Sequence, residues 1–322
     1  MFGFINLNKP AGFTSHDCVA KLRKLLNTKK IGHGGTLDPD ATGVLPIAVG
    51  KATRLLQFLP ELKAYRAKIR LGVSTTTDDL SGEIIKTVDT VGIKPTEIND
   101  ALDRFVGTIE QVPPIYSAIK KDGRKLYDLA RRGEKIALES RTVNIFKIEL
   151  VDIQQSTVHH HKKTGLAVDR LSPSEFYELE VNIECGPGTY IRAIARDLGE
   201  MLGVGGTLAN LVRSKSCGMH LDRSVSFAEI ESQLARQSLE FIEPSRILNH
   251  LGSVTLTQQD AKLWCQGQLV DLSKAIAVER ISNSKEGNYI VTKLEGDTLL
   301  GISILFQRND ILKIKPKIVL NG

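Results

Sequence analysis

A carboxylate inside a glycine-rich loop is the group in this chain that is best placed to do chemistry. Asp38 stands at the centre of residues 31–46, which read IGHGGTLDPDATGVLP. The proline at position 39 disfavours helical backbone at Asp38, and the glycines allow sharp turns and the close approach of another molecule. A carboxylate held in this way can act as a nucleophile, a general base, a metal ligand or a turn-forming side chain.

A tyrosine and an arginine further along the chain could assist such a carboxylate. Tyr65 opens residues 65–73, where apolar and basic side chains alternate as in a half-buried strand with a basic outer face. Arg192 lies close to the beginning of a helix that we expect to start at Thr189. The pattern alone is also compatible with an ordinary core tyrosine and a surface ion pair at these two positions.

The sequence GGTLDPDATGVLP at 34–46 resembles the signature of the TruB family of tRNA pseudouridine synthases. The resemblance implies that Asp38 is the catalytic nucleophile. Residues 65–67 (YRA) are similar to the family's second motif, in which the tyrosine, here Tyr65, stacks on the target base and is a candidate for removing the C5 proton. Residues 188–192 (GTYIR) are similar to the third motif, which implies that Arg192 pairs with Asp38 and that Tyr190 shapes the base pocket.

Further motifs extend the resemblance over nearly the whole chain. Residues 8–12 (NKPAG) match an N-terminal motif whose lysine, here Lys9, supports the active-site loop. His33 matches a histidine that contacts flipped-out nucleotides, and Leu211 resembles an apolar residue near the base pocket. Residues 113–135, with seven basic against three acidic side chains, match a thumb that folds over RNA. The candidate RNA contacts in this thumb are Lys120, Arg124, Arg131 and Arg132.

The chemistry of the family is consistent with this set of residues. Uridine isomerisation breaks the N1–C1′ bond, rotates the base and forms a C5–C1′ bond, so it needs a nucleophilic carboxylate but no redox step. Flipping the base out of its stack costs roughly a few kcal/mol, which stacking on an aromatic ring offsets by about 1–3 kcal/mol. An adjacent arginine opposes the rise in carboxylate pKa that burial causes and fixes the carboxylate's orientation. The sequence leaves open whether Asp38 attacks C6 of the base or C1′ of the ribose.

Composition and short motifs argue against several other classes of protein. The 322 residues carry a net charge of +6, which suits an anionic partner without requiring one. The four cysteines are scattered, so we expect no disulfide framework and no cysteine metal motif. Neither residues 50–52 nor residues 186–191 complete a phosphate-binding motif, so ATP and NAD are not expected. The three histidines at 159–161 read as a solvated loop rather than a metal site, and we predict no metal and no organic cofactor.

Hydrophobic periodicity predicts an α+β fold. Strands are expected at 4–7, 44–49, 65–73, 143–150 and 179–185, and helices at 15–27 with Ser15 as N-cap, at 51–59, at 96–105, from Thr189 and after the capping box at Ser226. After residue 249, a short helix at 260–265 and β-rich runs at 275–281, 289–294, 299–306 and 312–320 suggest a small barrel. This segment is similar to a PUA RNA-binding domain, with Gly301-Ile302 as the clearest trace. We therefore predict a pseudouridine synthase catalytic domain at 1–249, with a long mixed β-sheet flanked by helices, and a PUA-like β-barrel at 250–322.

Three features depart from the family pattern. Asp40 stands where many relatives have an apolar residue, and we expect it to point into solvent, although a second carboxylate could raise the pKa of Asp38. Gly34 replaces a common threonine, which could remove a hydrogen bond from the loop. Residues 154–175 resemble an insertion, and their polar sequence predicts a flexible surface loop.

These observations predict an enzyme that converts uridine to pseudouridine in the T loop of tRNA, at position 55 if the family's specificity holds. Phosphate contacts are expected from the thumb, the basic face of the first helix (Lys21, Arg23 and Lys24) and the stripe at 66–70. We expect no secretion and no membrane contact, because the chain shows neither a secretory signal nor a long apolar segment. The scattered cysteines suit a reducing cytosol, and we further expect a monomer with no obligate protein partner. Two alternatives remain: a guide-RNA-dependent pseudouridine synthase of the dyskerin type, and a tRNA-folding chaperone without catalysis.

Overall fold

The computed structural model describes all residues except 117–119, 122–123, 126–137, 159–160, 165–166, 171–173, 282–286, 309–310 and 321–322. Contacts between residues divide the chain into two compact units. The first unit comprises Met1–Pro39, Val44–Pro60 and Ser216–Gly322, and the second comprises Asp40–Gly43 and Glu61–Lys215. Asp38 therefore belongs to the first unit, whereas Tyr65 and Arg192 belong to the second.

The N-terminal part of the first unit consists of strands packed against helices. Its elements are β1 (Gly3–Lys9), α1 (Ser15–Leu25), β2 (Ile31–His33), β3 (Thr42–Val49) and the 3-10 helix η1 (Gly50–Phe58); the first two residues of β3, Thr42 and Gly43, lie in the second unit. β1 neighbours β3, and β2 pairs with β3 in antiparallel fashion, with His33 opposite Ile47. Apolar side chains of α1, the strands and α5 (Phe227–Ala235) form one core, which includes Leu22, Ile47 and Ile230. The helix predicted near 51–59 is present, and it is a 3-10 helix with tighter turns than an α-helix.

The first helix begins with a cap that differs from the predicted one. Thr14, not Ser15, is the N-cap of α1: its hydroxyl accepts a hydrogen bond from the Asp17 backbone, and the Asp17 carboxylate accepts one from the Thr14 backbone. The hydrogen bonds from Thr14 lower the pKa of Asp17 below its usual value. The Ser15 hydroxyl instead forms hydrogen bonds with the Leu37 backbone, next to Asp38. Thr14 therefore caps the helix.

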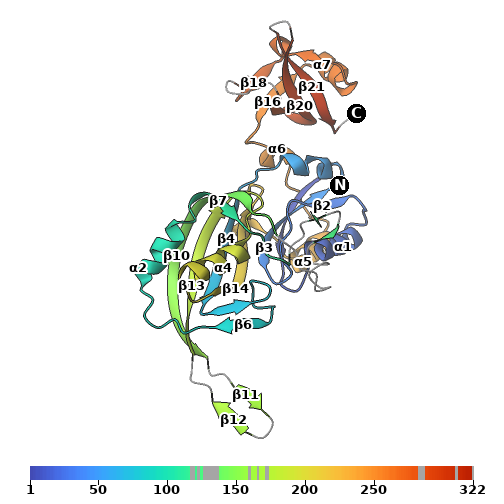
Figure 1. Cartoon of the computed structure of the whole chain (residues 1–322). Helices are drawn as coiled ribbons and strands as arrows, with labels where there is room; N and C mark the ends of the chain where they lie inside the picture. The colour runs from blue at the N-terminus through green and yellow to red at the C-terminus, as the bar shows by residue number, and fades with distance from the viewer. Residues whose placement is uncertain are drawn as a thin grey trace. The chain divides into compact units, whose positions relative to one another are not determined.

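The C-terminal part of the first unit contains a six-stranded curled sheet (Figure 1). The elements after the second unit are β15 (Met219–His220), η2 (Leu221–Arg223), α5, α6 (Pro244–Ile247), β16 (Gly252–Leu256), α7 (Gln258–Cys265), β17 (Val270–Asp271), η3 (Leu272–Lys274), β18 (Ala277–Glu279), β19 (Tyr289–Leu294), β20 (Thr298–Arg308) and β21 (Ile311–Val319). The strand order is β17-β21-β20-β19-β16-β18. Trp264 of α7 is fully buried in the core of this sheet, and its indole donates to the Ser303 hydroxyl. The predicted strands and the short helix are confirmed, whereas the domain boundary near residue 249 stays a prediction.

The second unit is built on a sheet in the order β14-β4-β13-β10-β7, and helices among its described residues pack against this sheet. Its elements are β4 (Lys63–Leu71), β5 (Val73–Thr75), β6 (Ile84–Thr87), α2 (Pro95–Asp103), β7 (Gly107–Gln111), β8 (Lys120–Lys121), β9 (Arg124–Lys125), β10 (Arg141–Val158), β11 (His161–Thr164), β12 (Ala167–Arg170), β13 (Ser174–Cys185), α4 (Ile191–Met201) and β14 (Gly206–Ser216), whose last residue lies in the first unit. Helix α4 contacts β4, and α2 contacts both β10 and α4, so the two helices lie on one face of the sheet (Figure 1). The predicted α+β class with a long, helix-flanked sheet is therefore confirmed.

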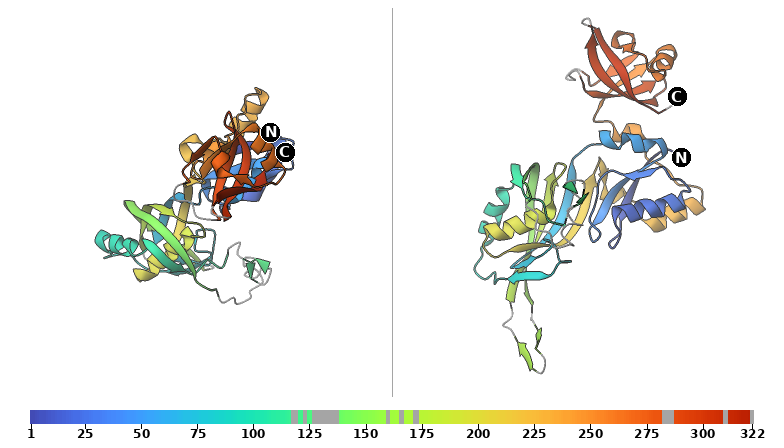
Figure 2. Two further views of the ribbon diagram at one scale, coloured as in Figure 1. Left: turned by 90° about the horizontal axis from the view of Figure 1, so that it is seen from above. Right: turned by 45° about the vertical axis from the view of Figure 1, so that its right-hand side comes forward.

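The described residues between 154 and 175 form an arm of paired strands, so the prediction of an irregular loop is wrong for them. β10 and β13 continue their antiparallel pairing as far as Val158 opposite Ser174. Beyond them β11 pairs with β12, from His161 opposite Arg170 to Thr164 opposite Ala167. The arm projects away from the sheet in both Figure 1 and the right-hand view of Figure 2. Backbone hydrogen bonds between adjacent strands hold this polar sequence in β structure without a large apolar face.

We expect Thr14→Ala to lower the free energy of unfolding by about 1 kcal/mol, because the variant loses the side-chain half of the capping box. Urea unfolding of wild type and variant measures this difference. The control is Thr87→Ala at an exposed position of β6, which should change stability by less than about 0.5 kcal/mol. Equal losses in the two variants would contradict the assignment of Thr14 as the cap.

Candidate active site

A buried lysine holds the backbone around Asp38. The Lys9 side chain is fully buried, and its ammonium group donates to the carbonyls of Pro10 (2.9 Å), Phe13 (2.6 Å) and Pro39 (2.8 Å). An ammonium group has three N–H donors, so three acceptors satisfy it completely. Lys9 thus ties the residue after Asp38 to the turn that follows β1, as the predicted supporting role requires.

The residue before Asp38 is fixed by a second, reciprocal contact. Leu37 is buried, and its backbone N–H donates a hydrogen bond to the Ser15 hydroxyl (2.9 Å). The same hydroxyl donates a hydrogen bond to the Leu37 carbonyl (3.2 Å). The Pro39 carbonyl accepts a further hydrogen bond from the Gly12 backbone (3.0 Å). Both neighbours of Asp38 are therefore anchored, while Asp38 itself is half-exposed in irregular backbone. Asp40 is exposed, as predicted.

The glycines before Asp38 keep their hydrogen bonds although Gly34 lacks a side chain. The Gly34 N–H donates to the Pro46 carbonyl (2.8 Å), and the Gly34 carbonyl accepts from the Cys217 thiol (3.2 Å). A Cβ at Gly34 would lie 3.0 Å from the Cys217 sulfur, which is closer than packing normally allows. The cysteine therefore occupies the space that a larger residue at position 34 would need. The Gly35 N–H points to Nδ1 of His33 (3.4 Å), which orients the half-buried imidazole at the end of β2.

Gly43 is required where β3 begins. Its φ is +103°, in the region that L-residues avoid, and a Cβ there would lie 2.3 Å from the Arg213 carbonyl of β14. Without a side chain, Gly43 pairs directly with Arg213 in parallel register. The close approach fixes the chain only a few residues after Asp38.

Tyr65 and Leu211 occupy buried positions in the second unit. In β4, Tyr65, Ala67, Ile69 and Leu71 are buried while Arg66 and Lys68 are exposed, which confirms the predicted alternation. Tyr65 lies opposite Ile183 of β13 in the sheet. Leu211 is buried in β14.

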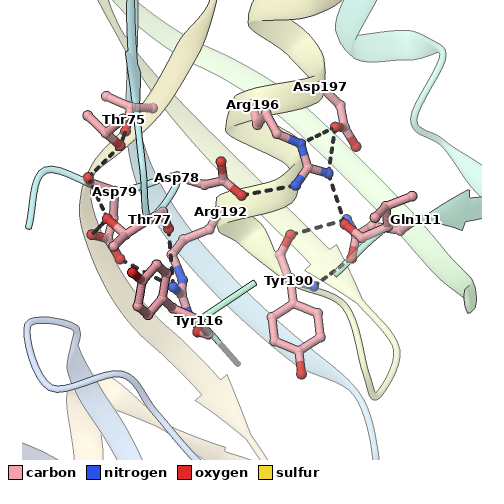
Figure 3. Close-up of polar contacts among 12 residues, drawn as sticks. Thr75, Thr77, Asp78, Asp79, Gln111, Tyr116, Tyr190, Arg192, Arg196 and Asp197 are labelled. Atoms are coloured by element: carbon pink, nitrogen blue, oxygen red, sulfur yellow. Dashed lines mark hydrogen bonds and ion pairs between the residues drawn. The ribbon is translucent and has the colours of Figure 1, made fainter. Parts of the chain in front are cut away.

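Arg192 lies at the N-terminal end of α4 in a dense set of polar contacts (Figure 3). Its side chain is only 7% exposed; Nη1 donates to the Thr77 carbonyl (3.2 Å) and lies 3.4 Å from Oδ2 of Asp79. Nη2 donates to the Tyr116 carbonyl (3.0 Å). Tyr190, the residue before the helix, exchanges two hydrogen bonds with the buried Gln111 side chain. The helix begins two residues later than predicted, and Tyr190 is its N-cap position.

Sequence reasoning missed the turn that holds Arg192. The Asp79 carboxylate accepts from the Thr77 hydroxyl (2.7 Å) and from the Ser81 backbone (3.0 Å) and hydroxyl (2.5 Å). The Thr75 hydroxyl donates to the Asp79 carbonyl (2.7 Å). The run TTTDDLS at 75–81 was a local signal of hydroxyl–carboxylate turns, but its connection to a helix more than 100 residues later is not visible in the sequence.

Burial shifts the pKa of two other carboxylates near this turn. Desolvation raises the pKa of Asp78, and the charges of Arg196 and Arg192 oppose the rise. Desolvation likewise raises the pKa of Asp197, again opposed by Arg196. Keeping such carboxylates ionised in a partly buried site depends on the neighbouring guanidinium groups.

Several predicted RNA contacts are engaged within the protein or lie outside the described residues. On the first helix, Lys21 forms an ion pair with Glu231 (3.1 Å) and Arg23 donates to the Ile31 carbonyl (3.1 Å). In the stripe, Arg66 forms an ion pair with Glu180 (3.4 Å), and Arg70 forms one with Glu178 (2.5 Å). These contacts make the helix face and the stripe at 66–70 weaker candidates for phosphate binding. Arg131 and Arg132 lie outside the described residues, and Lys120 and Arg124 are placed only as strand residues of β8 and β9.

Comparisons with known proteins agree on one family. The sequence model described as "TruB family pseudouridylate synthase (N terminal domain)" matches residues 23–191. The tRNA pseudouridine synthase B of Gloeothece citriformis (strain PCC 7424) is 52% identical over 276 residues, which are 86% of this chain and 84% of that protein. The tRNA pseudouridine synthase B of Synechocystis sp. (strain ATCC 27184 / PCC 6803 / Kazusa) is 42% identical over 325 residues and 100% of both chains.

The fold is shared with solved structures, of which two examples follow. A chain in the structure of an H/ACA RNP bound to a substrate RNA containing 2′-deoxyuridine has a TM-score of 0.70 at 23% identity, covering 99% of this chain and 86% of that one. A chain in a Cbf5-Nop10-Gar1 complex has a TM-score of 0.69 at 24% identity, covering 99% and 84%. Within the described ranges, no cluster of three or more potential metal ligands occurs and no helix is long and apolar enough to cross a membrane.

We expect Lys9→Met to lower the free energy of unfolding by about 3 kcal/mol, because three carbonyl groups lose their common donor. Urea unfolding measures the loss. The matched control is Lys21→Met, which removes a half-exposed ion pair with Glu231 and should cost less than about 1 kcal/mol. A similar loss in both variants would show that Lys9 does not brace the loop.

The pair Gly34 and Cys217 should be coupled in stability. Gly34→Thr alone should cost about 1–3 kcal/mol, because its Cβ would crowd the Cys217 sulfur. In the double variant with Cys217→Ala, part of this loss should be recovered, giving a favourable coupling energy of about 1 kcal/mol. Thermal or urea unfolding of wild type, both single variants and the double variant measures this coupling energy. As a control, the same cycle with Cys185→Ala in place of Cys217→Ala should give no coupling. Additive losses would refute the steric explanation.

Proposed function

The chain belongs to the TruB family of pseudouridylate synthases, and we propose that it converts the uridine at position 55 in the T loop of tRNA to pseudouridine, with Asp38 as nucleophile. It is an isomerase that acts on a uridine of tRNA, as are the relatives named tRNA pseudouridine synthase B that share 42–52% of its residues. The observation that carries the assignment of Asp38 is the loop itself, in which both of its neighbours are anchored while the carboxylate remains half-exposed.

The proposed reaction conserves every atom of the nucleotide. The Asp38 carboxylate adds to C6 of the base or to C1′ of the ribose, and the N1–C1′ bond breaks. After rotation of the base, C5 bonds to C1′, the proton leaves C5, N1 gains a proton, and the carboxylate is released. No electrons enter or leave, so no redox cofactor is needed for the balance.

The other residues of the proposed site have separate tasks. Tyr65 stacks on the flipped base and is the candidate for accepting the C5 proton, and Leu211 contributes apolar wall near the base. Arg192 pairs with Asp38, which favours the ionised carboxylate, and Tyr190 shapes the pocket. His33 contacts flipped-out nucleotides, while the thumb residues Lys120, Arg124, Arg131 and Arg132 neutralise phosphates.

The T loop is expected to be recognised mainly by its shape and its splayed bases, because side chains read the groove of A-form RNA poorly. The PUA-like sheet at the C-terminus adds RNA contacts. We further propose that the chain acts as a monomer in the cytoplasm without an obligate protein partner. The likeness to the chains of the H/ACA RNP and of the Cbf5-Nop10-Gar1 complex is one of fold, at 23–24% identity, whereas a relative matched over its full length is named for tRNA.

We expect Asp38→Asn to abolish product formation and to leave tRNA affinity within about threefold of wild type, since the amide keeps the size of the side chain but not its nucleophilicity. The measurement is the pseudouridine content of an unmodified tRNA transcript after incubation with each protein, together with filter binding of the same transcript. Residual turnover in the variant would exclude Asp38 as the nucleophile. Tight tRNA binding without product in the wild type would favour the guide-RNA-dependent enzyme or the chaperone.

A further inference from the structure

A second arginine lies one helical turn after Arg192 and has no role in the assignments above. Arg196 of α4 donates from Nε to the Asp197 carboxylate (2.8 Å), from Nη1 to the Asp78 carboxylate (2.9 Å) and from Nη2 to the Val112 carbonyl (2.9 Å). The side chain of Arg196 is 22% exposed and that of Asp78 only 15%. All three nitrogens of the guanidinium group are therefore engaged with geometrically fixed acceptors.

The two arginines bind the same pair of backbone segments (Figure 3). One segment is the turn at 75–81, where Arg192 contacts Thr77 and Asp79 and Arg196 contacts Asp78. The other is the segment after β7, where Arg192 contacts the Tyr116 carbonyl and Arg196 the Val112 carbonyl. Residues four apart lie on one face of a helix, so α4 holds both segments with two side chains from the same face.

Asp78 connects the contacts of Arg196 to those of Arg192. Its φ is +60°, a left-handed conformation that Asp tolerates better than most residues but that still needs support from its surroundings. The Asp78 carbonyl accepts from the Leu208 backbone (3.0 Å), and Leu80 donates back to Leu208 (3.1 Å), which ties the turn to β14. The conformation at Asp78 determines where the preceding carbonyl of Thr77 and the following carboxylate of Asp79 point, and both contact Arg192.

We propose that Arg196 is a positioning residue for the isomerisation: by holding Asp78 and Val112 it keeps the partners of Arg192 in place. This inference rests on the proposed function, in which Arg192 acts on the reacting carboxylate. Arg196 does not touch the substrate. Its loss displaces a catalytic side chain by way of the turn at 75–81, and displacements of about 1 Å in an active site can cost about 100-fold in rate.

The test is single-turnover pseudouridine formation on an unmodified tRNA transcript, with enzyme in saturating excess. Arg196→Met should lower the rate constant about 30-fold, with full product amplitude and a tRNA Kd within about threefold of wild type. The rate constant of Arg196→Lys should lie between those of wild type and Arg196→Met. An ammonium group can keep the ion pair with Asp78 but cannot also reach Val112 in the geometry of the guanidinium fork. Lys147→Met, which removes an exposed ion pair with Glu149 in the same unit, should retain the wild-type rate constant.

A double-mutant cycle tests the route through Asp78. Asp78→Asn should also slow the reaction, and the double variant Asp78→Asn/Arg196→Met should be no slower than Arg196→Met alone, because the two groups act through one contact. Multiplicative losses in rate would contradict this route.

The remaining outcomes separate the inference from simpler explanations. A reduced product amplitude with an unchanged rate constant would mean that Arg196 only stabilises the fold, and a raised Kd with an unchanged rate constant would mean that it contacts RNA; either result overturns the inference. A wild-type protein that forms no product would instead overturn the proposed function, so the two failures are distinguishable.

Discussion

The site depends on one buried ammonium group. Lys9 is fully buried, and a charge without partners would be far too costly in that environment. Its ammonium group donates to two carbonyls of the turn after β1 and to the Pro39 carbonyl. Both backbone segments must therefore lie within about 3 Å of the same nitrogen. The Ser15 hydroxyl then holds Leu37 from α1, and Asp38 is left between two anchored neighbours. In the proposed mechanism this fixed backbone orients the half-exposed carboxylate for attack, because the ordering cost is met by folding rather than by the reaction.

In the second unit, guanidinium groups hold irregular backbone in place. Arg192 and Arg196 each join backbone carbonyls to carboxylates, so the planar fork satisfies several acceptors in one geometry. The same charges oppose the rise in pKa that burial imposes on Asp78, and Arg196 does so for Asp197. Both units therefore use a long cation to fix irregular backbone beside a regular element. The three hydrogen bonds of Lys9 given above end on neutral backbone carbonyls, whereas the partners of Arg192 and Arg196 include carboxylates, so charge-changing substitutions at those carboxylates act directly on the second network.

Features that depend on neighbouring residues could be predicted from the sequence, and features that depend on distant partners could not. The alternation at Tyr65, the strand before η1 and the capping box at Ser226 arise from local periodicity and are confirmed. The cap of α1 was misassigned to Ser15 because Thr14 and Ser15 fit the same local pattern, and only the fold shows that the Ser15 hydroxyl binds Leu37. The turn at 75–81 was missed because its partner α4 is more than 100 residues away. The arm at 154–175 looked irregular because its polar strands lack an apolar face, although backbone pairing holds them.

The most direct test of the central claim is a site-by-site map of pseudouridine in an unmodified tRNA transcript treated with the purified chain alone. No guide RNA, second protein, nucleotide or added metal would be present, and a chelator would be included. We expect pseudouridine at a single T-loop uridine, position 55, and unmodified uridine elsewhere. An unmodified T loop, or product that appears only when a guide RNA and partner proteins are supplied, would contradict it.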